Sequence, residues 1–143
     1  MLVTEIMANC ALHRHEPVRD RRGALIALEG GANLPFAIER VYYLYDTPAD
    51  AQRGAHAHRA LHQWVVCVAG ACTILVDDGE RRQQVRLDRP DLALHIGPGI
   101  WREMRDFGEG TVLMVLASQR YDEGDYIRDY DAFLADARAR RSG

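Results

Sequence analysis

The stretch Arg53–Gly70, RGAHAHRALHQWVVCVAG, decides the fold of this chain. His56 and His58 are separated by one residue, directly after a glycine break. Because alternate side chains of a β-strand share a face, both imidazoles are predicted to point the same way. His62 lies at a different phase and is expected to face elsewhere. An apolar run typical of a buried strand, Gln63–Ala69, follows.

Outward from this stretch, short β-type runs recur about every eight to twelve residues, a spacing typical of a sandwich or barrel. Asp78-Gly79 predicts a hairpin turn, since both residues tolerate positive φ. Only the tail looks helical, with Asp129 or Asp131 as N-cap and an end near Arg140, closing one end of the barrel. The predicted strands are Ala24–Glu29, Ile38–Tyr45, Gln63–Ala69, Cys72–Val76, Gln84–Leu87, Leu92–Ile96 and Thr111–Ala117.

Composition narrows the class of protein. The 143 residues are 48% hydrophobic and 27% charged, which is typical of one globular domain, and neither linker nor repeat divides residues 1–143. The net charge of −3 argues against a nucleic-acid surface. All basic residues are Arg, so no lysine Schiff-base chemistry is available.

The expected location is the cytoplasm. The N-terminus lacks a basic start followed by an apolar run, so no signal peptide is expected. No apolar stretch approaches the roughly 18 residues that a transmembrane helix needs. Cys10, Cys67 and Cys72 are odd in number and lack the spacing of metal ligands, which indicates reduced thiols.

The spacing of Arg53–Gly70 resembles the first motif of the cupin superfamily, and Gly97–Arg102 (GPGIWR) resembles the second. A metal-binding cupin uses two His and a Glu of the first motif and a His of the second. Here the Glu position is Gln63 and the second His position is Arg102. An amide is a weak ligand and a guanidinium repels a divalent cation. We therefore expect a site without metal, in which His56 and His58 act as acid and base.

A closer resemblance covers roughly residues 18–135. In combination, seven blocks of sequence are similar to the dTDP-4-keto-6-deoxyglucose 3,4-ketoisomerases, which are cupin enzymes that supply 3-keto sugars for amination. The blocks, in order, are Asp20–Leu25, Asn33–Phe36, Arg40–Tyr43, Arg53–His58, Gly97–Met104, Val115–Ser118 and Tyr121–Tyr130.

The resemblance implies an all-β jelly-roll barrel of the cupin type, the double-stranded β-helix, with a short C-terminal helix. It implies a cytoplasmic homodimer that exchanges N-terminal strands, a thymidine diphosphate sugar as substrate and no cofactor. Its active-site residues match His56, His58 and Tyr42. Two positions that vary with the C4 configuration of the product match Arg22 and Arg102. Galacto-type members pair Arg with His there and gluco-type members pair Tyr with Arg, so this chain matches neither pattern.

The reaction moves a carbonyl from C4 to C3 of the sugar. Our hypothesis is that His56 removes the C3 proton, while His58 and Tyr42 carry protons between the oxygens or to C4. Arg22 or Arg102 could stabilise the enediolate, or one of them could bind the diphosphate.

Other residues carry weaker expectations. Arg53 could contact phosphate or sugar, and Trp101 could stack on thymine. Glu103 is expected to pair with Arg102, and Tyr43 to lie in the core. His13 and His15 are expected to face solvent, and Tyr121–Tyr130 alone reads as a solvated loop.

Two alternative functions stay open. One is a cupin-type nucleotide-sugar epimerase, which would also need a His base and a Tyr acid. The other is a non-catalytic nucleotide-sugar-binding module, although the acidic net charge and the absence of room for a DNA-binding element disfavour a sensor fused to such an element. A metal-dependent oxygenase is disfavoured by Gln63 and Arg102.

Overall fold

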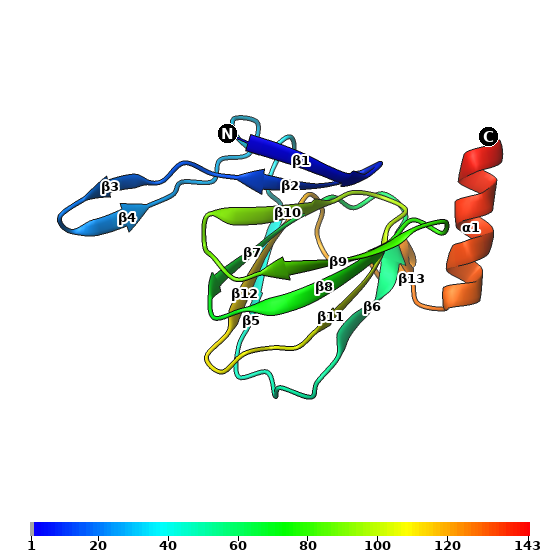
Figure 1. Cartoon of the computed structure of the whole chain (residues 1–143). Helices are drawn as coiled ribbons and strands as arrows, with labels where there is room; N and C mark the ends of the chain where they lie inside the picture. Colours follow the sequence, from blue (N-terminus) through cyan, green and yellow to red (C-terminus); the bar gives the residue numbers. More distant parts are fainter. Residues whose placement is uncertain (1) are drawn as a thin grey trace.

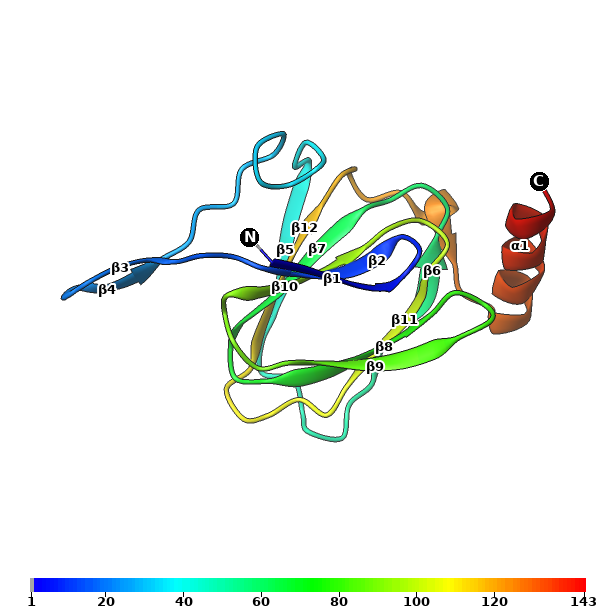
Figure 2. The ribbon, with the colours of Figure 1, turned by 45° about the horizontal axis from the view of Figure 1, so that its top comes forward.

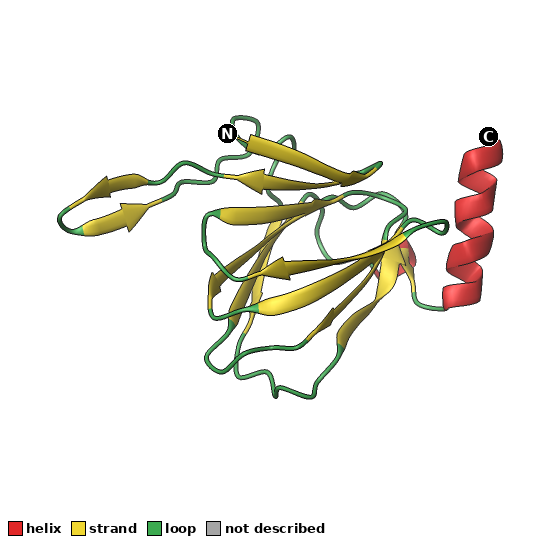
Figure 3. Ribbon diagram, in the orientation of Figure 1, coloured by secondary structure: helices red, strands yellow, loops and turns green. Residues whose placement is uncertain are grey.

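The computed structural model describes residues 2–143, and its architecture is two antiparallel sheets packed face to face (Figures 1 and 3). The six-stranded sheet has the order β1 (Leu2–Met7), β2 (Cys10–Arg14), β10 (Leu92–Ile96), β7 (Gln63–Ala69), β12 (Val112–Ala117) and β5 (Arg40–Leu44). The five-stranded sheet has the order β13 (Tyr126–Ile127), β6 (Arg53–His58), β11 (Trp101–Arg105), β8 (Cys72–Asp77) and β9 (Arg82–Leu87). The predicted all-β jelly roll is confirmed.

Strand alternation builds the core between the sheets. On β7 the side chains of Val65 and Cys67 point inward, and on β8 those of Cys72, Ile74 and Val76 do the same. All five are fully buried. Burial of this apolar area fixes the register, because a shift by one residue would turn each set to the opposite face.

The outer face of the six-stranded sheet is covered by the segment that leads into β5. Leu34 and Phe36 pack on Trp64, which is buried as expected of a core residue. This covering segment leaves the outer face of β5 open, so Tyr43 is 62% exposed. The expectation of a core position for Tyr43 is therefore wrong.

The helix α1 (Tyr130–Ser142) begins after a short 3-10 turn, Glu123–Asp125, and covers the outer face of the five-stranded sheet. Asp129 caps it by accepting a hydrogen bond of 2.9 Å from the Ala132 amide. Phe133 packs on Trp101 from outside the barrel. The predicted terminal helix is confirmed. Within residues 2–143, no helix combines the length and apolar character needed to cross a membrane.

A two-stranded arm leaves the barrel at the end opposite to α1 (Figure 2). It consists of β3 (Val18–Asp20) and β4 (Gly23–Leu25), joined by a tight turn. The predicted strand at Ala24–Glu29 is thus mostly irregular. Val18 and Leu25 face each other across the arm and are 70% and 62% exposed.

Four histidines gather on the outer face of the six-stranded sheet, around Trp64. His62 Nδ1 lies 3.0 Å from His95 Nε2, and His15 Nε2 accepts a hydrogen bond of 3.1 Å from Trp64. The His13 ring packs at 4.3 Å from the Trp64 ring. His15 is buried and His13 partly so, which corrects the expectation that both face solvent. The change follows from their place on and beside β2, an inner strand of the sheet.

We predict that His95→Gln flattens the loss of stability in acid. Burial, then the charges of His62 and His13, lower the pKa of His95 to about 4. The unfolded chain binds a proton at this residue below about pH 6.5, whereas the folded chain does so only near pH 4. The free energy of unfolding therefore falls as pH falls through this window, by about 1.4 kcal/mol per pH unit for this residue. Gln retains a polar group for His62 without titrating.

Urea unfolding of wild type and His95→Gln at several pH values in this window provides the measurement. The variant should show the smaller slope of unfolding free energy against pH. Equal slopes would show that His95 is not held neutral by the fold.

Candidate active site

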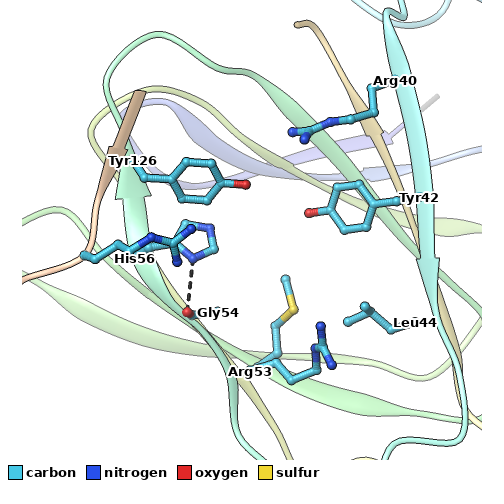
Figure 4. Close-up of a pocket in the computed structure, with 9 residues that line it drawn as sticks. Arg40, Tyr42, Leu44, Arg53, Gly54, His56 and Tyr126 are labelled. Carbon is cyan, nitrogen blue, oxygen red and sulfur yellow. Dashed lines mark hydrogen bonds between the residues drawn. The ribbon is translucent and has the colours of Figure 1, made fainter. Parts of the chain in front are cut away.

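A cavity of about 340 Å³ opens between the edges of the two sheets (Figure 4). β5 forms one wall, and β6 with β13 forms the opposite wall. Its lining combines cations, aromatic rings and one imidazole: Arg40, Tyr42, Leu44, Arg53, Gly54, His56, Met104, Tyr126 and Arg128. Of the sequence-predicted site residues, this cavity collects His56, Tyr42 and Arg53.

A β-bulge in β6 presents His56 to the cavity. The pairing of β6 with β11 shifts register at Ala55, and both Gly54 and Ala55 have positive φ, 84° and 57°. A Cβ on Gly54 would also lie 3.1 Å from the Arg102 carbonyl oxygen, so glycine suits this position on two counts. The same bulge places the Gly54 carbonyl 3.0 Å from His56 Nδ1. Because a carbonyl only accepts, Nδ1 carries the proton and Nε2 presents a lone pair.

His58 lies on the same face of β6, as predicted, one layer deeper than His56. The two rings meet edge to face with centroids 4.8 Å apart. His58 is fully buried, and its Nδ1 lies 3.1 Å from the Asp125 carboxylate. Asp125 is itself held by the amide groups of Ala60 and Leu61. The carboxylate accepts the Nδ1 proton, which leaves His58 Nε2 as a buried lone pair without a partner among residues 2–143.

Both imidazoles are held neutral. Burial, then the charge of Arg102, lowers the pKa of His56 to about 4. The same two causes, followed by the charge of His56, lower the pKa of His58. At neutral pH each ring is therefore a free base, able to take a proton without first losing one.

Arg102 lies beneath the cavity and is fully buried. It donates to the Ile100 carbonyl at 3.0 and 3.2 Å and to Gln63 Oε1 at 2.5 Å. Burial lowers the pKa of Arg102 to about 10, so it stays a cation at neutral pH. Glu103, its expected partner, pairs with Arg105 instead, because neighbouring residues of a strand point to opposite faces.

Tyr42 faces the cavity from β5, with its hydroxyl directed toward that of Tyr126 (Figure 4). Its oxygen accepts a hydrogen bond of 3.0 Å from Gln63 Nε2. Burial raises the pKa of Tyr42, while Arg102 and the Gln63 hydrogen bond act in the opposite direction. Tyr42 is therefore a neutral phenol at neutral pH.

Tyr126 is a cavity residue that the sequence interpretation missed. Its ring packs on His56 and His58, with centroids 4.8 and 4.3 Å away. The Arg128 guanidinium lies over that ring, 4.2 Å from its centroid, and is fixed by Glu123 at 2.6 and 2.9 Å. Tyr126 and Arg128 of the Tyr121–Tyr130 stretch thus line the site, and only the agreement of this stretch with the family blocks could have indicated this from the sequence.

Three predicted substrate contacts are absent from this cavity. Trp101 lies on the outer face of β11 against Tyr130 and Phe133, so its expected stacking on thymine finds no support. The Arg102 side chain points into the barrel but is fully buried beneath the residues that line the cavity. It can therefore act on a bound group only through the electric field of its charge or through Gln63. Arg22 lies at the tip of the arm, paired with Asp20 at 2.6 Å and remote from the cavity of its own barrel.

The donor set does not fit a divalent metal. Gln63 offers one amide oxygen, which Arg102 already occupies, and the guanidinium places a positive charge beside the two imidazoles. Within residues 2–143, no three His, Cys, Asp or Glu side chains come together as a metal site.

Comparison with known families identifies the chain's relatives. Residues 8–138 match the family model described as FdtA: WxcM-like, C-terminal. The chain belongs to this WxcM-like family.

Within this family, the chain is 51% identical over 114 residues to the TDP-4-oxo-6-deoxy-alpha-D-glucose-3,4-oxoisomerase of Aneurinibacillus thermoaerophilus, which covers 80% of this chain and 82% of that protein. Among solved structures it resembles the 3,4-ketoisomerase QdtA of Thermoanaerobacterium thermosaccharolyticum, with TM-score 0.92, 42% identity, and 94% and 98% of the two chains covered. A mutant of QdtA was solved with TDP-4-keto-6-deoxyglucose.

The TDP-quinovose 3,4-ketoisomerase WlaRB of Campylobacter jejuni also resembles this WxcM-like chain, with TM-score 0.87 and 46% identity, covering 90% and 99% of the two chains. The sugar epimerase NovW of Streptomyces spheroides shares 19% identity, with TM-score 0.74, over 88% of this chain and 72% of its own. That likeness shows the shared fold alone.

We predict that His56 and His58 both carry their proton on Nδ1 at neutral pH. Long-range ¹H–¹⁵N correlation spectra distinguish the two tautomers, with the signals assigned from His56→Asn and His58→Asn. His62, whose partner is another imidazole, serves as internal comparison. An Nε2–H tautomer at either position would contradict the assigned hydrogen bonds to the Gly54 carbonyl or to Asp125.

Proposed function

We propose that this chain is a sugar 3,4-ketoisomerase that converts TDP-4-keto-6-deoxyglucose to a TDP-3-keto-6-deoxyhexose, as a cytoplasmic enzyme built on one cupin domain. Membership of the WxcM-like family and the ketoisomerase relatives support the reaction. The observation that carries it is the unprotonated His56 Nε2 in a cavity faced by the Tyr42 hydroxyl. The buried, unpaired thiols of Cys10, Cys67 and Cys72 agree with a reducing compartment.

The proton transfers follow from this arrangement. His56 takes the C3 proton through Nε2, and an enediolate forms across C3 and C4. Tyr42, on the opposite wall, and His58, whose Nε2 is unpartnered, move protons between the two oxygens and to C4. C3 of the sugar is oxidised and C4 is reduced within one molecule, so the protein has to supply only acid and base groups. Each positioned group of this kind contributes about 10²–10⁴-fold to the rate.

The charges around the cavity suit an anionic substrate and an anionic intermediate. Arg40, Arg53 and Arg128 line the cavity and can bind the diphosphate. Arg102 is excluded from contact, but its buried charge faces the same space and favours the enediolate over the neutral ketone. Binding of the diphosphate and stabilisation of the enediolate are thus assigned to different arginines.

The enzyme is further proposed to be a homodimer that exchanges N-terminal strands. The arm exposes Val18 and Leu25, which a partner barrel could cover. Arg22, at the tip of the arm, would then contribute to the cavity of the partner subunit and not to its own.

We predict that His56→Asn loses at least about 10²-fold in kcat, because the carbon base is removed. The assay is incubation with TDP-4-keto-6-deoxyglucose in deuterated water, followed by NMR of the product, which also reports the configuration at C4. Wild type should exchange the C3 hydrogen and introduce deuterium at C4. The variant His13→Asn, which changes a partly buried histidine that does not line the cavity, serves as matched control.

Three outcomes would contradict this proposal. Exchange at C3 in His56→Asn at the wild-type rate would show that another group is the carbon base. Labelling of wild type at C3 and C5 would instead indicate an epimerase, and tight binding without turnover would indicate a binding module.

The exchanged arm is tested by mixing two defective chains, Arg22→Ala and His56→Asn. In an exchanged heterodimer, the intact barrel of the Arg22→Ala chain receives Arg22 from the His56→Asn chain. Co-expression should restore about one quarter of wild-type activity, because half the dimers are mixed and each has one intact site. No recovery on mixing, when each chain alone is inactive, would place Arg22 outside the partner's cavity.

A further inference from the structure

Gln63 joins the buried cation to the cavity phenol. Its side chain is 1% exposed and lies between Arg102 and Tyr42. Gln63 Oε1 is 2.5 Å from an Arg102 nitrogen, and Gln63 Nε2 is 3.0 Å from the Tyr42 oxygen. The three side chains come from β7, β11 and β5, so two sheets meet at this amide.

The chemistry of these groups fixes the direction of both hydrogen bonds. A guanidinium has only donors, so the amide oxygen must face Arg102 and the amide nitrogen must face Tyr42. The nitrogen in turn only donates, so the Tyr42 oxygen accepts. The Tyr42 proton is then free, because no group among residues 2–143 accepts it. The open direction is the cavity, where the hydroxyl points (Figure 4).

We propose that Gln63 is a positioning residue which, held by Arg102, compels Tyr42 to present its hydroxyl proton to the cavity as a donor. This inference rests on the proposed function, because it assigns Tyr42 the donor side of the proton transfer. It also gives a reason for an amide where a metal-binding cupin has a carboxylate. A carboxylate would pair with Arg102 and accept the Tyr42 proton, turning the donor away from the substrate.

The remaining charges around Tyr42 do not impose this direction. Arg40 of the same strand lies 5.4 Å from the centre of the Tyr42 ring, over its face and not at its hydroxyl. The hydroxyl of Tyr126 of β13 is directed at the Tyr42 hydroxyl, but the two do not form a hydrogen bond. His56 of β6 lines the same cavity and is neutral. Gln63 is thus the residue whose substitution would reverse the direction of the hydrogen bond to the Tyr42 hydroxyl.

The test is Gln63→Glu, which replaces the side-chain NH2 group by an oxygen, preserves the shape of the side chain and keeps an acceptor for Arg102. Its kcat and KM for TDP-4-keto-6-deoxyglucose are measured in the wild-type and in the Tyr42→Phe background. We expect Gln63→Glu alone to lower kcat by about 10²-fold or more, with KM within about three-fold, because Gln63 does not line the cavity. In the Tyr42→Phe background the same change should lower kcat by less than about three-fold.

The inference is overturned if Gln63→Glu retains kcat within about three-fold of wild type, or if it costs the same factor in both backgrounds. A second readout is independent of turnover: the ¹³Cζ shift of Tyr42 at neutral pH, assigned from Tyr42→Phe, should move in Gln63→Glu as the phenol turns from acceptor to donor toward residue 63. An unchanged shift would also overturn it. A wild-type chain that fails to turn over the sugar would refute the proposed function, while the ¹³Cζ shift would still decide the role of Gln63.

Discussion

The buried guanidinium of Arg102 is the constraint on which the site depends. A cation without a carboxylate partner is costly to bury, and here it is stabilised by hydrogen bonds to the Ile100 carbonyl and to Gln63. Its charge adds to burial in keeping the two imidazoles of β6 unprotonated. It also orients the Gln63 amide and biases the cavity toward anions. One buried charge therefore links base strength, the direction of a hydrogen bond and stabilisation of the intermediate.

The two histidines receive different supports from the same fold. The β-bulge turns the Gly54 carbonyl back onto His56, so the backbone of β6 fixes the tautomer of its own side chain. His58 depends instead on Asp125, which arrives from the segment before the terminal helix and is held by backbone amides. The same C-terminal segment continues into α1, which packs on the outer face of the barrel through Phe133. The packing of α1 outside the barrel therefore supports the position of His58 inside it.

The sequence allowed prediction of the elements with strong local patterns. Gln63–Ala69 and Leu92–Ile96 are strands with the predicted bounds, and Asp129 caps the helix. The shared face of His56 and His58 also followed from alternation alone. The predicted core position of Tyr43 was wrong. The exposure of a side chain on an edge strand depends on which other segment covers that strand, and this is a property of the tertiary structure. Trp101 faces α1 because one residue of alternation separates the helix-facing side of β11 from the cavity side, and motif spacing does not show which side carries the cavity.

Other parts of the site had no local signal. Tyr126 and Asp125 belong to a short segment whose charged and aromatic residues look solvated until β13 pairs with β6. The role of Gln63 became visible only when β5, β7 and β11 were placed around it, since its partners are 21 and 39 residues away in the chain. Long-range pairing of this kind is fixed by topology, which motif spacing does not specify.

The most direct test of the account is the titration of His56 itself in the ligand-free wild-type protein, followed through its ¹³Cε1 signal. The account predicts a ring that stays neutral through the physiological range and takes up a proton only near pH 4, matching the lowered pKa of His56. A midpoint near the ordinary value of about 6.5 would contradict it, because the ring would then not be kept unprotonated by burial and by the buried cation.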